Sequence, residues 1–186
     1  MSVKRAAALG LLLGAVVVIA VLLRAGRDGN PTVARVGGEP ITRTQLSAVV
    51  DHFQLEAKGE GKPFPDEDSA AFRRVRNRLL GLLVYRAELR KAAGRLGVGV
   101  TRLQVLKRLQ SAGAPDPEGA ERDSFEYGSA ETQLLYERIF EKVTRSVAAP
   151  TPAELAARRN AAMARYVARL RRETQVRYEP GYAPGP

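Results

Sequence analysis

The chain has 186 residues, a formal net charge of +10, a single histidine and no cysteine. This length fits one domain with accessory segments. Without cysteine the sequence offers no disulfide, no lipid anchor attached through cysteine and no thiolate metal site, and the lone histidine excludes a pair of histidine ligands.

An uncharged apolar run lies near the N-terminus. At about 1.5 Å per residue, residues Ala6–Leu23 are just long enough to cross a hydrocarbon core of about 30 Å. Lys4 and Arg5 precede the run and two arginines follow it, so the positive-inside rule favours an inside N-terminus only weakly. We expect a single-pass cell-membrane protein: residues 1–5 in the cytoplasm, a signal anchor in the lipid bilayer at 6–23, a linker at 24–31 and the domain on the extracytoplasmic side.

A cleaved signal peptide is the competing interpretation of the same run. Val18 and Ala20 form a small-residue cleavage pattern. Cleavage there would leave the apolar residues Val21–Leu23 exposed, which favours the uncleaved anchor.

Residues Thr32–Leu46 form a compact local pattern. Val33 and Val36 predict a short strand, and the Gly37-Gly38 pair that follows predicts a tight turn, because glycine adopts positive φ without steric cost. A helix then begins around Ile41 and Thr42. Thr42 with Gln45 is a capping box, in which each side chain bonds the other residue's backbone, and Ile41 can pack on Leu46 as a hydrophobic staple.

Three more helices follow in the central part of the chain. The first helix ends near Lys58, and a Gly- and Pro-rich loop leads to a long helix capped by Asp66, Asp68 or Ser69 and ending at Gly97. Thr101 caps a short third helix, residues 112–128 read as a surface loop, and Ser129 begins a fourth helix. Apolar residues at helical spacing mark the inner faces of these helices: Leu46, Val49, Val50 and Phe53; Phe72, Val75, Leu79, Leu82, Leu83 and Leu89; Leu135, Ile139 and Phe140.

The last helix has the sharpest start signal. Thr151 is the cap, Pro152 takes the first helical position and Glu154 completes a capping box. The helix runs to about Thr174, residues 175–178 are extended and 180–186 form a disordered tail. We therefore divide the domain, residues 32–179, into an N-terminal part at 32–147 and a closing helix and strand at 151–179.

Three of these elements together resemble a known family. The first spans Val33 to Leu46, the second is the stretch Leu96–Thr101, and the third combines the Thr151–Glu154 helix start with Tyr166 to Tyr178. In this order they are similar to the N-terminal domain of the SurA and PrsA type extracytoplasmic folding factors, with Gly37 where that family usually has Asn. The motif residues are Val36, Gly38, Glu39, Ile41, Thr42, Leu46, Tyr166 and Leu170.

The resemblance implies a mainly α domain with a short extended segment at each end, whose closing helix completes the core formed by the N-terminal helices. In many members a parvulin-type prolyl isomerase domain separates the Thr151–Glu154 motif from the Tyr166 motif. Here only Leu155–Arg165 lie between them, whereas a small domain needs about 100 residues. We expect no isomerase domain and no enzyme activity.

The residues alone reveal no catalytic, metal or cofactor site. His52 lies beside Asp51 on a helix, where adjacent side chains point in different directions, so a structural role is favoured. The glycines lack the spacing of a phosphate-binding loop, which argues against ATP. The aromatic residues are scattered rather than interleaved with arginine, so nucleic acid is not an expected partner.

The remaining class of function is binding. The family resemblance implies an ATP-independent chaperone that binds unfolded or extended segments of exported polypeptides in an apolar groove. Candidate groove residues, each of which also fits a plain core position, are Phe53, Phe72, Leu79, Leu83, Tyr136 and Phe140. The alternative is an adaptor or scaffold that docks one specific envelope partner. The arginine-rich segment Arg158–Arg177 predicts either an anionic partner surface or a solvated helix face.

Overall fold

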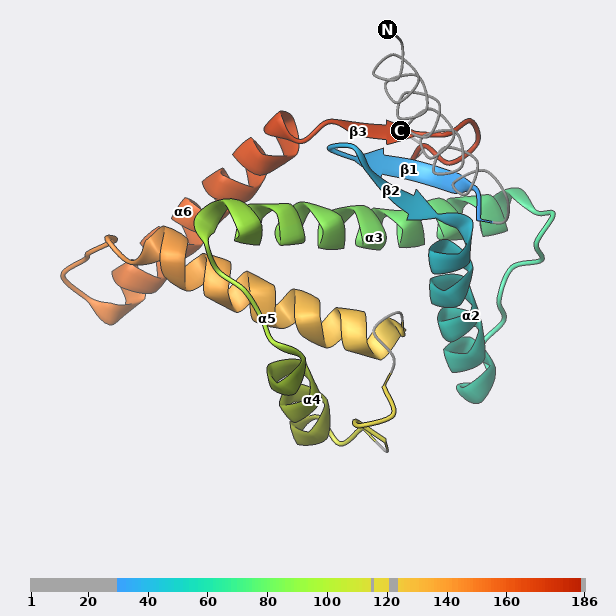
Figure 1. Ribbon diagram of the computed structural model, residues 1–186, viewed down its shortest axis with the longest axis horizontal. Helices are drawn as coiled ribbons and strands as arrows, with labels where there is room; N and C mark the ends of the chain where they lie inside the picture. Colours follow the sequence, from blue (N-terminus) through green and yellow to red (C-terminus); the bar gives the residue numbers. More distant parts are fainter. Residues whose placement is uncertain (1–29, 115, 121–123, 185–186) are drawn as a thin grey trace, which may run out of the picture. The chain divides into compact units, whose positions relative to one another are not determined.

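The computed structural model describes residues 30–114, 116–120 and 124–184 (Figure 1). The predicted anchor at 6–23, the cytoplasmic residues 1–5 and most of the linker lie outside the described residues. No helix in the described ranges is long and apolar enough to span a membrane. Residues from Thr32 onward form one unit, and the account below concerns that unit by itself.

A three-stranded antiparallel sheet joins the two ends of this unit. Strands β1 (Thr32–Val36) and β2 (Glu39–Thr42) form a hairpin, and β3 (Val176–Tyr178) pairs with the other edge of β1, giving the order β2-β1-β3. The backbone N–H of Gly37 also donates to the carbonyl of Gln175 at 2.7 Å. The predicted first strand and turn are confirmed. Residues Glu39–Thr42 form a second strand that was not predicted, and the first helix begins directly after it at Arg43.

The predicted caps of the first three helices are confirmed. Helix α2 (Arg43–Gly59) begins with the Thr42–Gln45 capping box, and α4 (Arg102–Ser111) begins with an equivalent box at Thr101. Of the three candidate caps for α3 (Ala70–Leu96), Ser69 is the one used, and Gly97 ends the helix in the left-handed conformation at φ 63°. Local polar pairs three residues apart thus set these boundaries.

The fourth helix begins earlier than predicted. Helix α5 covers Phe125–Thr144, and Ser124, not Ser129, is its cap, accepting a hydrogen bond from the Tyr127 N–H. Part of the predicted loop at 112–128 is therefore helical. Gly128 weakens the helical pattern at this point, but Tyr127 and Ala130 are buried against α4 and hold the first turn in place.

Helix α6 (Pro152–Glu173) starts as predicted at Thr151, whose hydroxyl accepts a hydrogen bond from the Glu154 N–H at 3.3 Å. The helix continues without a break past Tyr166. No domain is inserted between the Thr151–Glu154 and Tyr166 motifs, which agrees with the sequence.

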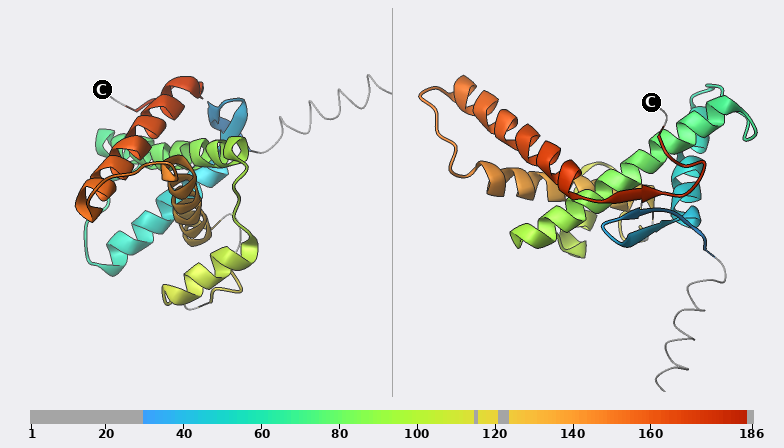
Figure 2. Two further views of the ribbon diagram at one scale, coloured as in Figure 1. Left: turned by 90° about the vertical axis from the view of Figure 1, so that its left-hand side faces the viewer. Right: turned by 90° about the horizontal axis from the view of Figure 1, so that it is seen from above.

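Helix α3 is the common support of the core. In Figure 1 it lies between the sheet on one side and α5 on the other. Its first half packs with β1, β2 and α2, and its second half packs with α5 and α6 (Figure 2). The closing helix does complete the core, through α3 and α5. We call the contacts of the first half of α3 with β1, β2 and α2 the first core cluster, and those of its second half with α5 and α6 the second core cluster. Their fully buried members include Val33, Val36, Leu80, Leu89, Ile139 and Met163.

The segment after β3 is not the disordered tail that the sequence suggested. Tyr182 packs against the first core cluster, and the backbone carbonyls of Gly181 and Ala183 accept hydrogen bonds from side chains of α3. The Tyr182 ring and these two hydrogen bonds together hold the described part of this segment on the domain.

The backbone conformation of the Gly37–Gly38 turn favours glycine at position 37, and this preference can be tested. Gly37 has φ +56°, and a Cβ there would also meet the ammonium end of Lys91. We expect Gly37→Ala to lower the free energy of unfolding by about 1–2 kcal/mol, the cost of the left-handed conformation. Gly81, inside α3, has open space around its Cα, so Gly81→Ala should raise stability by about 0.5–1 kcal/mol. Urea unfolding followed by circular dichroism measures both, and equal midpoints would contradict the turn geometry.

The buried carboxyl group of Glu88, beneath β3, predicts that the free energy of unfolding depends on pH. Only 5% of Glu88 is exposed; burial raises the pKa of its carboxyl group, and Arg171 offsets part of the rise. Because the folded state holds this proton more tightly, the resulting stability is full below the unfolded pKa of about 4.3 and is lost as pH rises through the folded pKa. Glu88→Gln should therefore be more stable than the native chain near neutral pH.

This advantage should vanish at a pH below about 4, where the native carboxyl group is also neutral. Thermal melts at the two pH values test it, with Glu141→Gln on the exposed face of α5 as a control for loss of one charge. A Glu88→Gln advantage that is the same at both pH values would contradict the assignment.

Candidate functional site

The six residues predicted to bind clients do not line one groove. Leu79 and Leu83 are buried in the core, where α3 meets the sheet and α2, and Phe53 and Phe72 pack half-buried on the same cluster. Tyr136 and Phe140 lie instead on α5, with ring centroids 6.3 Å apart, and Phe140 packs on the cluster shared with α6. The structure separates the six into two groups.

Most of the family-motif residues have structural positions. Val36, Ile41 and Leu46 are buried where the hairpin meets α2 and α3, and Tyr166 and Leu170 pack α6 onto the other half of α3. Gly38 occupies the turn at φ +94° and Thr42 caps α2. Glu39 differs from these, because it is exposed and lines a cavity described below.

A depression lies along one side of α2, and we call it the α2 groove. Its volume of about 410 Å³ falls within the range of about 300–1,000 Å³ typical of ligand sites. Apolar side chains from α2, α3 and the C-terminal segment share the wall with charged groups of both signs. The groove is lined by Arg43, Leu46, Ser47, Val50, Asp51, Glu67, Phe72, Arg76 and Tyr182.

The C-terminal segment forms one wall of the α2 groove. The guanidinium of Arg76 lies 4.3 Å from the centroid of the Tyr182 ring, and its Nη2 donates to the Gly181 carbonyl at 2.6 Å. Asn77 Nδ2 donates to the Ala183 carbonyl at 2.8 Å. Sequence reasoning missed this wall because it depends on contacts between residues about a hundred positions apart.

An aromatic cluster fixes α2 relative to α5. The rings of His52 and Phe125 stack with centroids 4.2 Å apart, and Phe53 meets Phe125 edge-on at 5.1 Å. His52 Nδ1 lies 3.0 Å from a carboxylate oxygen of Glu126. The only histidine of the chain therefore packs two helices together, which is the structural role favoured from the sequence.

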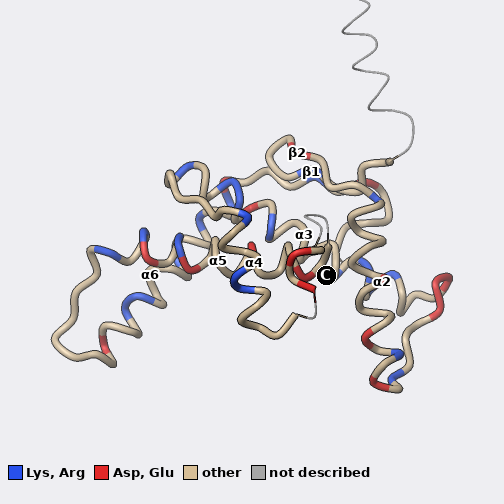
Figure 3. Tube along the Cα trace, turned by 60° about the horizontal axis from the view of Figure 1, so that its bottom comes forward, with Lys and Arg blue, Asp and Glu red and all other residues tan. Residues whose placement is uncertain are grey.

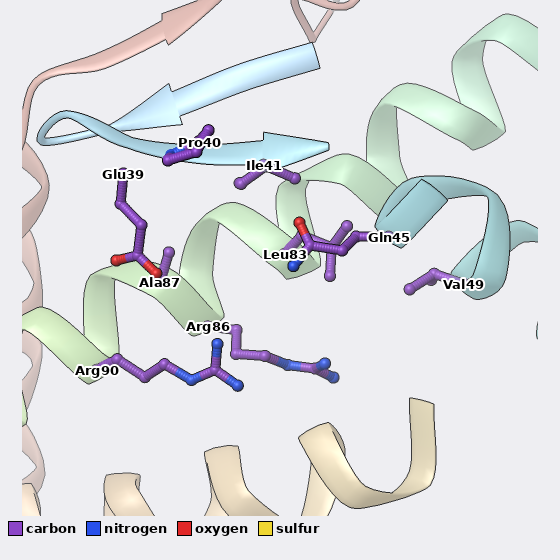
Figure 4. Close-up of a pocket in the computed structure, with 9 residues that line it drawn as sticks. All are labelled: Glu39, Pro40, Ile41, Gln45, Val49, Leu83, Arg86, Ala87 and Arg90. Carbon is purple, nitrogen blue, oxygen red and sulfur yellow. The ribbon is translucent and has the colours of Figure 1, made fainter. Parts of the chain in front are cut away.

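A second, smaller depression lies beneath β2, on the other side of α2. We call it the arginine cavity; its volume is about 50 Å³. Figure 4 shows the guanidinium groups of Arg86 and Arg90 side by side next to α3, with Glu39 reaching down from β2. The cavity is lined by Glu39, Pro40, Ile41, Gln45, Val49, Leu83, Arg86, Ala87 and Arg90.

The two arginines of this cavity differ in their partners. Arg90 Nε donates to the Glu131 carboxylate on α5 at 2.9 Å. Burial lowers the pKa of Arg86, Arg90 lowers it further and Glu131 opposes the shift. The sequence signal was present, since the two arginines are four residues apart beside the apolar face of a helix, but only the apolar positions were read as candidates.

The arginine-rich segment Arg158–Arg177 does not form an uninterrupted basic surface. Figure 3 marks the basic positions of this part of the chain in blue, and Glu173 is the one acidic residue between Arg158 and Arg177. Glu173 pairs with Arg95 and Arg169, while Arg171 lies over the Tyr85 ring. Of the arginines in this segment, Arg171 therefore contacts the neighbouring helix α3, and Arg169 is paired within α6. Within the described residues, no cluster of three histidine or acidic side chains is arranged to hold a metal ion.

A family model matches most of the described chain. The family model described as SurA-like N-terminal domain matches residues 3–134, which is more than half of the chain. No curated protein matches the sequence. The match includes the hairpin, α2, α3, α4 and the first half of α5, and with them both depressions except for the Tyr182 wall. The chain therefore belongs to the SurA-like N-terminal domain family, and this membership indicates a chaperone-like role in general terms.

Proposed function

We propose that this protein binds unfolded or extended segments of exported polypeptides without using ATP. We further propose that residues 6–23 anchor it in the cell membrane with the domain on the extracytoplasmic side. Family membership supports the chaperone-like part of this proposal, and the length and apolar character of 6–23 support the anchor.

The α2 groove is the observation that carries the proposal. Phe72 and Tyr182, which are partly exposed and are backed by the buried Leu46 and Val50, offer apolar surface to a client side chain, at about 25 cal/mol for each Å² removed from water. A contact of 100 Å² would then contribute about 2.5 kcal/mol, which is enough for transient retention but not for tight binding. Burial of this kind is non-directional, so it tolerates varied sequences.

The rim of the groove suits an unfolded chain for a second reason. Arg43, Asp51, Glu67 and Arg76 supply both donors and acceptors. An extended backbone presents N–H and C=O groups that need partners once they leave water. The groove can satisfy both kinds without reading the side-chain sequence.

We propose that binding is not coupled to prolyl isomerisation. The uninterrupted α6 helix occupies the place where related chains carry a parvulin domain. The neighbouring side chains of the groove include no histidine and no cysteine.

Blocking the groove tests the proposal. Ser47 is exposed on α2 and lines the groove, so Ser47→Trp fills the space without disturbing the core; Ala48→Trp, at the next exposed position outside the groove, is the matched control. The full chain and the control should suppress light scattering by a test protein diluted from denaturant, and Ser47→Trp should lose most of that suppression.

Two outcomes would contradict this proposal. Absence of suppression by the native chain at several-fold excess would remove the chaperone function, and a single stoichiometric partner in a membrane pull-down would then favour the adaptor. Equal suppression by both variants would remove the α2 groove as the client site.

The wall formed by the C-terminal segment gives a separate prediction. Tyr182→Ala removes the ring that contacts Arg76, and the free energy of unfolding should fall by about 0.5–2 kcal/mol, the range for a cation–π contact. Tyr182→Phe keeps the ring and should remain close to native. Urea unfolding of the full chain measures both, and equal losses in the two variants would show that the hydroxyl group, not the ring, holds this wall.

A further inference from the structure

Within the described part of the chain, Arg86 is a half-buried cation that forms no ion pair. Among the residues that the structure describes, no carboxylate lies within ion-pair distance of its guanidinium and no hydrogen-bond acceptor is engaged by it. A charge withdrawn from water in this way costs free energy unless an opposite charge pairs with it. The folded chain tolerates that cost within the arginine cavity.

The packing around Arg86 keeps the guanidinium in place. A Cβ on Gly128 would overlap this guanidinium, so the glycine at that position of α5 leaves room for Arg86 in its observed conformation. Arg90, one turn further along α3, is held by Glu131 on the same helix α5. Arg90 is therefore held by α5, and the Arg86 guanidinium lies against the backbone of the same helix.

The cavity in front of these cations has the size of a small anionic group. At about 10–15 Å³ for each water-sized position, 50 Å³ admits about three to five heavy atoms. A carboxylate has three heavy atoms, and its two oxygens match the paired donors of a guanidinium. Ile41, Val49, Leu83 and Ala87 supply apolar walls, which exclude water and strengthen such a pair.

We propose that the arginine cavity binds a carboxylate group of the client polypeptide, with Arg86 as its principal partner and Arg90 as a supporting charge. This inference rests on the proposed function. The carboxylate comes either from the free C-terminus of the client or from an aspartate or glutamate side chain. The cavity thereby adds a charge-specific anchor to the non-directional α2 groove.

Glu39 sets the affinity of this site from its opposite wall. Its side chain reaches from β2 towards α3 on the same side as the arginines (Figure 4), and Glu39 lines the cavity. An incoming carboxylate meets this like charge. Glu39→Gln should therefore strengthen binding, while Arg86→Gln should weaken it, and this opposition of sign distinguishes a defined site from general attraction to a basic protein.

Three fluorescent peptides of one apolar sequence test the site on the full chain: a free C-terminal acid, its C-terminal amide, and the amide with one internal glutamate. Fluorescence anisotropy should show the acid binding about tenfold or more tightly than the amide, the value of a charge-assisted hydrogen bond. Arg86→Gln should abolish the preference. Arg78→Gln, an exposed arginine on the same helix, should preserve it. Tight binding of the glutamate peptide would assign side-chain carboxylates as ligands, and weak binding would assign the C-terminus.

Any of three results would overturn the carboxylate site: the native chain binds the acid and the amide equally, the acid peptide fails to bind, or the Arg86→Gln variant keeps the preference for the acid. These outcomes are separable from failure of the proposed function. If aggregation is still suppressed while the acid preference is missing, only the carboxylate site falls. If the acid preference is present while suppression is missing, only the chaperone proposal falls.

Discussion

The antiparallel pairing of β1 with β3 is the interaction on which the rest of the unit depends. Ala34 faces Tyr178 and Val36 faces Val176, and the Gly37 and Glu179 N–H groups extend the ladder at both ends. This pairing makes β1 a central strand, whose Val33, Ala34 and Val36 are buried. It also holds the end of α6 near the sheet, so that α6 closes over α3 and the segment after β3 reaches the α2 groove.

Local features were predictable from the sequence, and long-range features were not. The caps at Thr42, Ser69, Thr101 and Thr151 depend on residues three positions apart, and each was visible in the sequence. The second strand became visible only in the structure, because a short segment such as Glu39–Thr42 acquires strand geometry from its partner. The third was expected as an extended segment at 175–178, but its pairing with β1 was not. At Leu82 the helical pattern favoured an inward position, yet 44% of the residue is exposed, while its neighbour Leu83 is buried.

The same distinction applies to the candidate sites. Apolar residues such as Leu79 and Phe140 were selected from periodicity, which cannot separate a core position from a groove position. Glu39 was recognised only as a motif residue, and Arg86 was not recognised at all, because its isolation depends on where Gly128, Arg90 and Glu131 lie in space. Helix α2 shows how close the two sites are, since Gln45 and Val49 line the arginine cavity while Leu46 and Val50 line the α2 groove. Helix α2 therefore separates the two depressions and contributes a wall to each.

The distance along the chain between β1 and β3 has a consequence for the order of folding. Val36 and Val176 pair across about 140 positions, and contacts of such high sequence separation form late, because the intervening loop must first be closed. The helices α3, α5 and α6 supply that closure. Until they have assembled, the β1–β2 hairpin presents the unpaired edge of β1 and the apolar side chains beneath it, which is the kind of surface that unfolded polypeptides join. From this topology we expect that, during its own synthesis, the chain exposes the same type of apolar segment that we propose it binds in others.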